Sequence, residues 1–254
     1  MSVTTVIATY NGEKYIAEQI TTIIGQLEPQ DEVVIIDDCS SDNTVNVIKA
    51  LQDSRIKLFL NDHNRGITFS FNRGISLASN DIIFMSDQDD IWLKGRVASM
   101  VGKLLERECC VVSSNTEFMD VSGKPIVFQI DGVRENRSNN NLGNIFDIFI
   151  GRTNYYGCAM AFKKVLVALI LPIPSFVESH DLWIALAGNL IGSNVHLNQK
   201  TLRRRIHCSN ASNVQRGMFF KIRARGIFVI SIVVLLFRHW RLSGTSYCGK
   251  SLSV

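Results

Sequence analysis

The sequence lacks features that mark several common classes of protein. Only four of its 254 residues are prolines, and 46% are hydrophobic. Such a chain can bury a large core as one large domain or as one domain with a small appendage, which disfavours a disordered protein. The first residues have no basic segment and only a short apolar stretch. We therefore expect no signal peptide and a cytoplasmic location.

The cysteine and glycine patterns exclude further classes. The six cysteines show neither paired CxxC spacing nor the density of a small disulfide scaffold, and we interpret them as reduced thiols. No GxGxxG follows the first apolar run, and no GxxxxGK(S/T) follows an expected strand. A dinucleotide-dependent oxidoreductase and a P-loop nucleotide hydrolase are therefore both disfavoured.

The formal net charge is +4, and the charges are unevenly distributed. Acidic residues gather in the first 130 positions, whereas RRR at 203–205 and KIRAR at 221–225 make the end basic. Nothing in this pattern requires a nucleic acid, and we expect none as a partner.

Strand and helix patterns alternate along the first half of the chain. Apolar, β-branched runs predict strands at 4–9, 32–37, 55–60, 81–86 and 109–114. Apolar residues at helical spacing predict helices within 16–27, 44–51, 67–78 and 97–105. This alternation requires right-handed crossovers and a mostly parallel sheet covered on both faces. The sequence therefore predicts an α/β nucleotide-binding architecture.

Polar and acidic residues stand where three of these strands end. The three segments are Thr9-Tyr10-Asn11, Asp37-Asp38 and Asp87-Gln88-Asp89. Ligands of such sheets bind at the carboxyl ends of the strands, so we expect the segments to converge. Carboxylates suit a phosphate ligand if Mg²⁺ or Mn²⁺ lies between them, because these ions take oxygen ligands. The alternative is that each carboxylate only caps a helix or faces solvent.

Four stretches together resemble the inverting GT-A glycosyltransferases of family 2. They are TTVIATYNGEKYIAEQI from residue 4, EVVIIDDCSSDNT from 32, NRGITFSFNRGISLASNDIIFMSDQDDIW from 64 and ESHDLW from 178. The version SDQDDIW is similar to bacterial rhamnosyltransferase-like enzymes. The resemblance covers residues 3 to about 212. It implies a GT-A, Rossmann-like sheet flanked by helices, a nucleotide-sugar donor, and Mn²⁺ or Mg²⁺ as cofactor.

The resemblance implies roles for the donor-side residues. Thr9, Tyr10 and Asn11 would contact the nucleotide, with Tyr10 against the base. Asp38 would accept a hydrogen bond from the imide N–H of uracil or thymine. An aromatic face stacks on a planar base, and a carboxylate only accepts hydrogen bonds, so both roles agree with physical chemistry. Asp87 resembles the ribose ligand. An ordinary half-buried tyrosine is the alternative for Tyr10.

Asp89 resembles the metal ligand of the DxD motif, although Gln88 replaces the small or acidic residue often found between the two aspartates. We expect Asp90 to begin the next segment rather than to bind the ion. Arg65, in the NRG before the third helix, would meet base or phosphate, or would be a solvated loop arginine.

The stretch LRRRIHCSNAS, residues 202–212, resembles a segment that folds over the diphosphate. His207 would then be a metal or phosphate ligand. One of Arg203, Arg204 and Arg205 would hold the leaving diphosphate, and the sequence does not distinguish among the three. A cation and an arginine suit this position because the departing group gains negative charge.

Asp181 in ESHDLW matches the family's catalytic base, which removes the proton of the acceptor hydroxyl. The alternative is that Asp181 only caps the helix that follows. His180 and Glu178 are secondary candidates.

The stretch YYGCAMAFKK, residues 155–164, resembles the acceptor-side strand of the family. Tyr155 or Tyr156 could stack on a pyranose, and Gly157 would let a sugar approach the backbone. The polar stretch 131–144 before it predicts a flexible surface loop.

The resemblance and the composition together divide the chain into three parts. Residues 1–110 form the nucleotide-sugar-binding half, 111–212 the acceptor-binding and catalytic half, and 213–254 a basic, apolar helical tail. The apolar run 226–237 is shorter than the roughly 20 residues that span a bilayer. The tail either lies on the cytoplasmic face of an anionic inner membrane or packs on the domain or on a second copy. The oligomeric state is not predicted.

The sequence thus predicts an inverting, metal-dependent glycosyltransferase of bacterial surface polysaccharide synthesis, such as O-antigen or capsule. It would move L-rhamnose from dTDP-rhamnose, or a hexose from a UDP-sugar, to a glycan or a polyprenyl-linked saccharide. One alternative is a sugar nucleotidyltransferase, which usually has a glycine-rich N-terminal loop with an arginine and a lysine. The other is a noncatalytic, membrane-peripheral carbohydrate-binding scaffold with the same fold.

Overall fold

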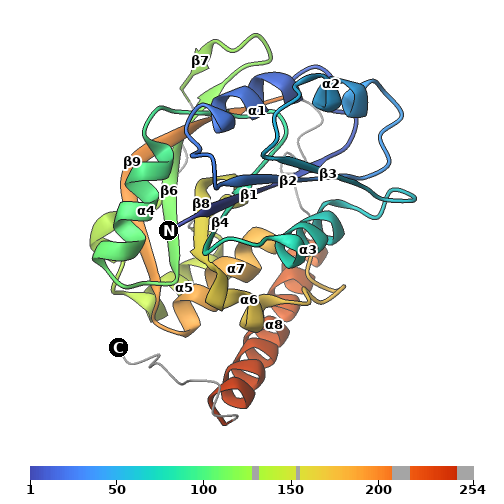
Figure 1. The fold of residues 1–254 in the computed structure, drawn as a ribbon. Coiled ribbons are helices and arrows are strands. Elements are labelled where there is room, and N and C mark those ends of the chain that lie inside the picture. The colour runs from blue at the N-terminus through green and yellow to red at the C-terminus, as the bar shows by residue number, and fades with distance from the viewer. Residues whose placement is uncertain (128–131, 153–154, 208–217, 245–254) are drawn as a thin grey trace.

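The computed structural model describes residues 1–127, 132–152, 155–207 and 218–244 (Figure 1). The strands are β1 (Val3–Thr9), β2 (Glu32–Asp37), β3 (Ile56–Leu60), β4 (Ile82–Ser86), β5 (Ile91–Trp92), β6 (Val111–Met119), β7 (Pro125–Ile126), β8 (Met160–Lys163) and β9 (Asn194–Arg205). The α-helices are α1 (Ile16–Ile24), α2 (Thr44–Ala50), α3 (Ile67–Leu77), α4 (Arg96–Glu106), α5 (Asn141–Ile150), α6 (Val167–Ile170), α7 (His180–Leu190) and α8 (Met218–Gly244). Short 3-10 helices are η1 (Glu135–Arg137), η2 (Gly157–Ala159) and η3 (Lys164–Leu166).

One mostly parallel sheet runs through the molecule in the order β3-β2-β1-β4-β8-β6-β9-β5, and β7 pairs with β6. Strands β3, β2, β1 and β4 are parallel neighbours. Strand β8 is antiparallel to both β4 and β6, so β6 and its parallel neighbour β9 point in the same direction as β4. The predicted α/β, Rossmann-like fold is confirmed.

Strand β2 shows how both faces of the sheet are covered. Val33 and Ile35 belong to the apolar cluster that α1, α2 and α4 cover, whereas Val34 and Ile36 belong to the cluster under α3 and α7 (Figure 1). Alternate residues of a strand point to opposite faces, and all four of these side chains are fully buried. The unbroken apolar run of β2 therefore reflects burial on both sides, as parallel sheets require.

Two predictions about the second half were incomplete or wrong. Strand β9 was not predicted, because its middle, 198–200, is polar and exposed and breaks the apolar pattern. The flexible loop predicted at 131–144 is wrong in part, since η1 and the first residues of α5 lie in it. Asn140 explains the start of α5, because its side chain accepts a hydrogen bond from the backbone N–H of Gly143 at 3.1 Å.

One match to GxxxxGK(S/T) does occur, at 244–251. Gly244 is the last residue of α8, and the other residues of the match lie outside the described part of the chain. A P-loop joins a strand to the start of a helix, whereas this match follows a helix. It therefore does not change the exclusion of a P-loop protein.

The apolar tail forms one helix, α8, which is longer than the predicted apolar run. Residues Ile222–Ser243 are long and apolar enough, by length and composition, to cross a membrane, which corrects the sequence-based length. One side of α8 packs on the domain. Leu235 is buried there, and Arg238 donates hydrogen bonds to the carbonyls of Leu169 and Ile170, each at 3.1 Å.

Close packing of α3 on the sheet leads to a prediction about stability. A Cβ at Gly74 would stand 2.4 Å from Cγ1 of Val6 and 3.2 Å from Cγ1 of Ile36. We expect Gly74→Ala to lower the free energy of unfolding in urea by about 1 to 3 kcal/mol, because an overpacked core must shift its neighbours.

Gly102→Ala in α4 is the matched control for this prediction. Among the described residues, no atom outside its own helix lies within 4 Å of a Cβ built at Gly102. Alanine there should leave the free energy of unfolding unchanged or raise it by up to about 1 kcal/mol. Equal effects of the two substitutions would contradict close packing at Gly74.

Candidate functional site

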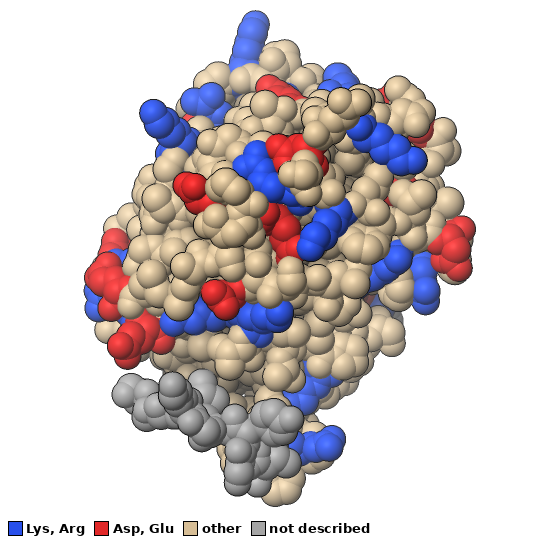
Figure 2. Space-filling view, viewed as in Figure 1, with Lys and Arg blue, Asp and Glu red and all other residues tan. Residues whose placement is uncertain are grey.

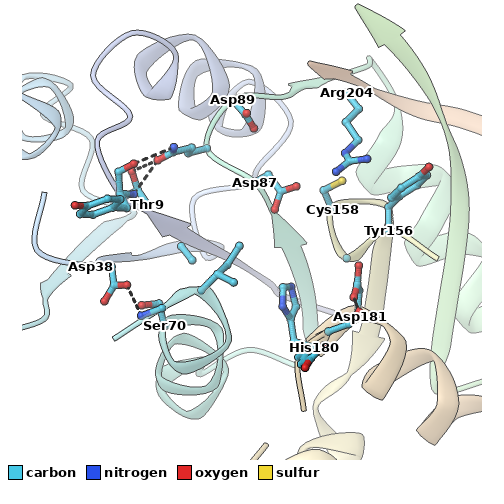
Figure 3. A pocket seen from close by; sticks show the side chains of 18 of the residues that line it. Thr9, Asp38, Ser70, Asp87, Asp89, Tyr156, Cys158, His180, Asp181 and Arg204 are labelled. Carbon is cyan, nitrogen blue, oxygen red and sulfur yellow. Dashed lines mark hydrogen bonds between the residues drawn. The ribbon is translucent and has the colours of Figure 1, made fainter. Parts of the chain in front are cut away.

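A cleft of about 400 Å³ opens where the parallel strands β1, β2 and β4 end (Figure 3). Its other walls come from the turn before β8, the start of α7 and the end of β9. The predicted site residues that line it are Thr9, Tyr10, Asp38, Asp87, Asp89, Tyr156, Gly157, His180, Asp181, Arg204 and His207. The predicted site residues outside its lining are Asn11, Arg65, Tyr155, Arg203 and Arg205.

Gln88, between the two aspartates of the DxD motif, joins the ends of β1 and β4. Its Oε1 accepts hydrogen bonds from Oγ1 of Thr9 at 2.6 Å and from the backbone N–H of Tyr10 at 2.9 Å. Its Nε2 donates to the carbonyl of Tyr10 at 3.2 Å. The backbone of Tyr10 is thus held in place while its side chain remains 46% exposed and available to stack on a planar ligand.

Asp38 is buried and shapes the loop after β3. Its carboxylate accepts hydrogen bonds from Nδ2 of Asn61 at 2.6 Å and from the backbone N–H groups of Arg65 and Gly66 at 2.9 and 2.7 Å. A carboxylate can accept about four hydrogen bonds, so one remains for a ligand in the cleft. The guanidinium of Arg65 lies over the ring of Phe69, with 3.7 Å from its Cζ to the ring centroid. Arg65 does not line the cleft in this arrangement, and its predicted contact with a base or phosphate stays a prediction.

Asn11 also acts on a loop rather than on the cleft. It has a positive φ of 50°, and its side-chain oxygen accepts a hydrogen bond from the backbone N–H of Ser41 at 2.8 Å. Its own N–H donates to Oγ of Ser40 at 2.9 Å. Asn11 therefore connects the segments that follow β1 and β2.

Asp89 and His207, both predicted as metal ligands, meet at one point of the cleft. Nε2 of His207 lies 2.5 Å from Oδ2 of Asp89, and both side chains are mostly buried. Carboxylate oxygens and an imidazole nitrogen form a donor set that fits Mn²⁺ and, through the oxygens, Mg²⁺. The residues therefore fit the predicted ion, which would replace their direct contact.

Asp90 and Cys158, which were not predicted as site residues, lie close to Asp87. Asp87, Asp90 and Cys158 offer ligand atoms within 4.8 Å of one another. Asp90 is 1% exposed, and its Oδ1 accepts a hydrogen bond from the backbone N–H of Arg205 at 3.2 Å. Its Oδ2 has no hydrogen-bond partner among the described residues. Asp90 does precede β5 directly, as predicted, but it also belongs to the buried acidic group.

The electrostatics of this group follow from burial and crowding. Burial and the neighbouring carboxylate of Asp89 raise the pKa of Asp87 to about 6, although Arg204 opposes the shift. Burial, followed by Asp87 and Asp89, raises the pKa of Asp90 well above its usual range. Burial alone would lower the pKa of Arg204, but Cys158 and the aspartates outweigh it and raise the pKa. Arg204 is therefore the charged counterpart of the acidic group.

The strand geometry of β9 separates the three arginines. Arg203 pairs with Glu117 at 2.9 Å. The side chain of Arg205 is buried, and its Nε donates to the carbonyl of Asp89 at 3.0 Å. Only Arg204 of the three lines the cleft, where its guanidinium lies 4.5 Å from the ring centroid of Tyr156 (Figure 3). Consecutive strand residues point to opposite faces, which explains the separation.

The far wall of the cleft carries Asp181. The N-cap of α7 is Ser179, and Asp181 lies in the first turn, where its Oδ1 accepts hydrogen bonds from Oγ of Ser179 and from the N–H of Leu182. The alternative that Asp181 is itself the N-cap is therefore wrong. Figure 3 shows Asp181 on the opposite side of the cavity from Asp38, with its side chain below Tyr156.

His180, Gly157 and Tyr156 complete this wall. His180 stacks on Phe71 with 4.3 Å between ring centroids, and burial lowers its pKa. A Cβ at Gly157 would stand 3.1 Å from Nε2 of His180, so a side chain at this position would crowd His180 and narrow the cleft. Tyr155, in contrast, is buried behind the wall and its hydroxyl is 2.8 Å from Nε2 of His196. Of the two tyrosines, only Tyr156 can reach a ligand in the cleft.

The sequence profile of glycosyl transferase family 2 matches residues 4–169, which include strands β1 to β4 and the cleft residues that follow them. This chain belongs to glycosyl transferase family 2. The resemblance stated from the sequence is thereby confirmed, and the nucleotidyltransferase alternative is excluded.

Curated relatives of this family 2 chain include two named bacterial enzymes. It is 30% identical over 118 residues to the UDP-Glc:alpha-D-GlcNAc-diphosphoundecaprenol beta-1,3-glucosyltransferase WfgD of Escherichia coli, with 46% of this chain and 47% of WfgD covered. It is 35% identical over 124 residues to the dTDP-rhamnosyl transferase RfbG of Shigella flexneri, with 46% and 43% covered. The chain spans about half the length of the curated relatives it matches.

Solved structures share the fold of this family 2 chain. S. aureus TarS 1–349 in complex with UDP-GlcNAc aligns with a TM-score of 0.67 at 18% identity, covering 99% of this chain and 77% of that one. The mannosyltransferase PcManGT from Pyrobaculum calidifontis, in complex with GDP-Man and Mn²⁺, aligns with a TM-score of 0.59 at 16% identity, covering 96% and 75%. At these identities the likeness establishes the GT-A fold alone.

The raised pKa of Asp87 leads to a prediction about pH. The folded chain binds the proton of the Asp87 carboxyl more tightly than the unfolded chain does. Ionised Asp87 therefore lowers the free energy of unfolding above about pH 6, and this loss disappears as the pH falls below about 4. With a chelator present, we expect Asp87→Asn to raise the free energy of unfolding at about pH 7.5 by on the order of 1 kcal/mol, and not at about pH 4. Urea titrations at both pH values measure it.

Asp62→Asn is the control for the pH prediction, because the Asp62 side chain is 77% exposed. It should change the free energy of unfolding little at either pH. A gain from Asp87→Asn that is the same at both pH values would show that charge is not its cause.

Proposed function

We propose that this chain transfers a sugar from a nucleoside diphosphate donor to a hydroxyl of a saccharide or lipid-linked saccharide, with inversion at the anomeric carbon. The observation that carries the proposal is one cleft that holds both kinds of group the reaction needs. Asp89, His207 and Arg204 supply charge for a diphosphate at one side, and Asp181 supplies a carboxylate at the other. Bacterial surface polysaccharide synthesis is the proposed setting.

On the donor side, the ring of Tyr10 would stack on the base, and the free acceptor site of Asp38 would take the imide N–H of uracil or thymine. Asp87 would hold the ribose. The activities for which WfgD, a UDP-Glc glucosyltransferase, and RfbG, a dTDP-rhamnosyl transferase, are named support a pyrimidine donor such as a UDP-hexose or dTDP-rhamnose. We assign residues 1–110 to the donor and 111–212 to acceptor binding and catalysis.

In the transfer step, Asp181 accepts the proton of the acceptor hydroxyl while the hydroxyl oxygen attacks C1 of the donor sugar from the face opposite the diphosphate. The bond between C1 and the diphosphate breaks as the new bond forms. Arg204 stabilises the negative charge that develops on the departing diphosphate. Asp89 and His207 would hold Mn²⁺ or Mg²⁺, which supplies Lewis-acid stabilisation of the same charge when bound. Tyr156, under Arg204, and Gly157 border the space left for the acceptor sugar.

We place the enzyme in the cytoplasm, where nucleotide sugars are made, and expect no nucleic acid partner. On the face shown in Figure 2, Lys and Arg side chains are scattered among Asp and Glu rather than gathered in one basic patch. A nucleic acid would need such a patch to neutralise its phosphates.

Release of nucleoside diphosphate tests the proposed reaction. The donors are dTDP-rhamnose, UDP-glucose, UDP-galactose and their N-acetyl forms, with Mg²⁺ or Mn²⁺ or with a chelator, and with bacterial lipid extract as acceptor. We expect metal-dependent release from one donor, reduced at least about 100-fold in Asp89→Ala. Asp62→Ala, an exposed carboxylate outside the cleft, should match the wild type.

Asp181→Asn separates catalysis from binding. It should reduce the rate of nucleoside diphosphate release by roughly 100-fold or more. Nucleotide affinity, measured by calorimetry, should stay near that of the wild type. If the wild type shows no release of nucleoside diphosphate and no nucleotide binding, the result would favour the noncatalytic scaffold, which has the same fold.

The separation of the three arginines predicts different consequences for each. Arg204→Met should weaken binding of UDP or dTDP with Mg²⁺ by roughly 10- to 100-fold, because it removes the one arginine of the three that lines the cleft. Arg203→Met, which loses an exposed pair with Glu117, should bind as the wild type does. Calorimetry on both variants measures the difference, and equal affinities would contradict the assignment.

A further inference from the structure

Helix α8 has a second apolar face that the described part of the domain leaves exposed. Large hydrophobic side chains on it are between 48% and 69% exposed. They are Ile222, Val229, Ile230, Val233, Leu236, Phe237 and Trp240. We call these seven side chains the outer face of α8. Contiguous apolar surface of this kind marks a site of interaction.

Helical geometry shows that the outer face is a single stripe. At about 100° per residue, its members fall within an arc of about 120° around the helix axis. Leu235 and Arg238, which contact the domain, and the buried Ser231 fall on the opposite side. Helix α8 is therefore attached along one side, and its other side is apolar and exposed among the described residues.

The charges of α8 identify the chemistry of that partner. Residues 218–244 contain no aspartate or glutamate. Arg223, Arg225 and Arg241 are exposed and lie on the two borders of the outer face. Where α8 is visible at the lower end of Figure 2, its surface is tan and blue. An apolar stripe bordered by basic residues suits the boundary between lipid tails and anionic headgroups.

The same charges argue against a second copy of the chain as the partner. Two outer faces packed together would bring Arg225 and Arg241 of both copies near one another, and the facing helix has no carboxylate to offset their charge. Arg223 differs, because it already pairs with Glu178 of the domain. A membrane-spanning arrangement is also disfavoured. It would detach Leu235 from the domain and move Arg238 into the hydrocarbon.

We propose that α8 binds the surface of an anionic phospholipid membrane through its outer face, with the helix in the plane of the headgroups. One ion pair joins α8 to the wall of the cleft. Arg223 pairs with Glu178 at 2.8 Å, and Glu178 lines the cleft beside Asp181. If the proposed function holds, on which this consequence rests, the membrane presents a lipid-linked acceptor at the Asp181 side of the cleft.

Vesicle binding by the full chain, without nucleotide, tests the proposal. Flotation with phosphatidylglycerol-containing vesicles should recover at least about tenfold more protein than flotation with pure phosphatidylcholine, and salt should reduce the difference. Tryptophan fluorescence gives a second readout. Trp92 and Trp183 are 3% and 2% exposed and Trp240 is 69% exposed, so a blue shift on binding reports Trp240.

Substitutions on α8 give the matched comparison. Val233→Asp and Phe237→Asp should each reduce binding to anionic vesicles by more than about tenfold, because each places a charge in the apolar stripe. Arg225→Gln should reduce it by about fivefold. Val165→Asp is the control, since Val165 is as exposed as Val233 but lies on η3, and it should bind as the wild type does. Nucleotide affinity should be unchanged in all four variants.

Three results would overturn the proposal. Equal vesicle binding by Val233→Asp and the wild type would exclude the outer face. A dimer in sedimentation equilibrium that Val233→Asp dissociates, with no vesicle binding, would assign the face to a second copy. Resistance of the bound chain to alkaline extraction would assign a spanning helix. Vesicle binding without sugar transfer would instead contradict the proposed function and leave this inference intact.

Discussion

The contacts of Arg205 with the acidic turn after β4 hold the rest of the site in register. The backbone N–H of Arg205 donates to Asp90, and its guanidinium donates to the carbonyl of Asp89. With Arg205 anchored away from the cleft, strand geometry directs Arg204 into it. His207, two residues after Arg205, then contacts Asp89. The end of β9 and the DxD turn therefore form one unit, although 115 or more residues of chain separate them.

This unit concentrates negative charge in a place that is costly to charge. Asp87, Asp89 and Asp90 follow one another closely, and burial raises the pKa of both Asp87 and Asp90. Arg204 offsets part of this repulsion. A divalent cation would offset more, and a diphosphate would in turn balance the cation and Arg204. Charge balance of this kind would allow an acidic cleft to hold the anionic donor that we propose.

The second half of the molecule adds the groups that the donor side lacks. Helix α7 carries Asp181 in its first turn, and α8 packs against α6 and α7 while it exposes its outer face. The pair between Arg223 and Glu178 lies where these elements meet the cleft. Helix α8 therefore contributes to the core on one side, and in our proposal its other side places a surface suited to lipid beside the proposed catalytic carboxylate.

The sequence by itself determined the α/β architecture and the strand ends at which the site forms. β-Branched runs and helical stripes are local patterns, so they identify β1 to β4 and the intervening helices, and the polar residues that follow them must share one edge. The two motifs that contain Asp89 and Asp181, SDQDDIW and ESHDLW, were equally visible. Strand β9 was not, because its polar middle, 198–200, breaks the apolar pattern that identifies a buried strand.

Only the tertiary structure decided which neighbouring residues enter the cleft. Arg204 rather than Arg203 or Arg205, and Tyr156 rather than Tyr155, line it. Such choices depend on pairing between distant strands, and a shift of one residue in that pairing would reverse the direction of every side chain. Burial of Asp90 beside Cys158, and exposure of one face of α8, likewise depend on what the fold places against them rather than on any local pattern.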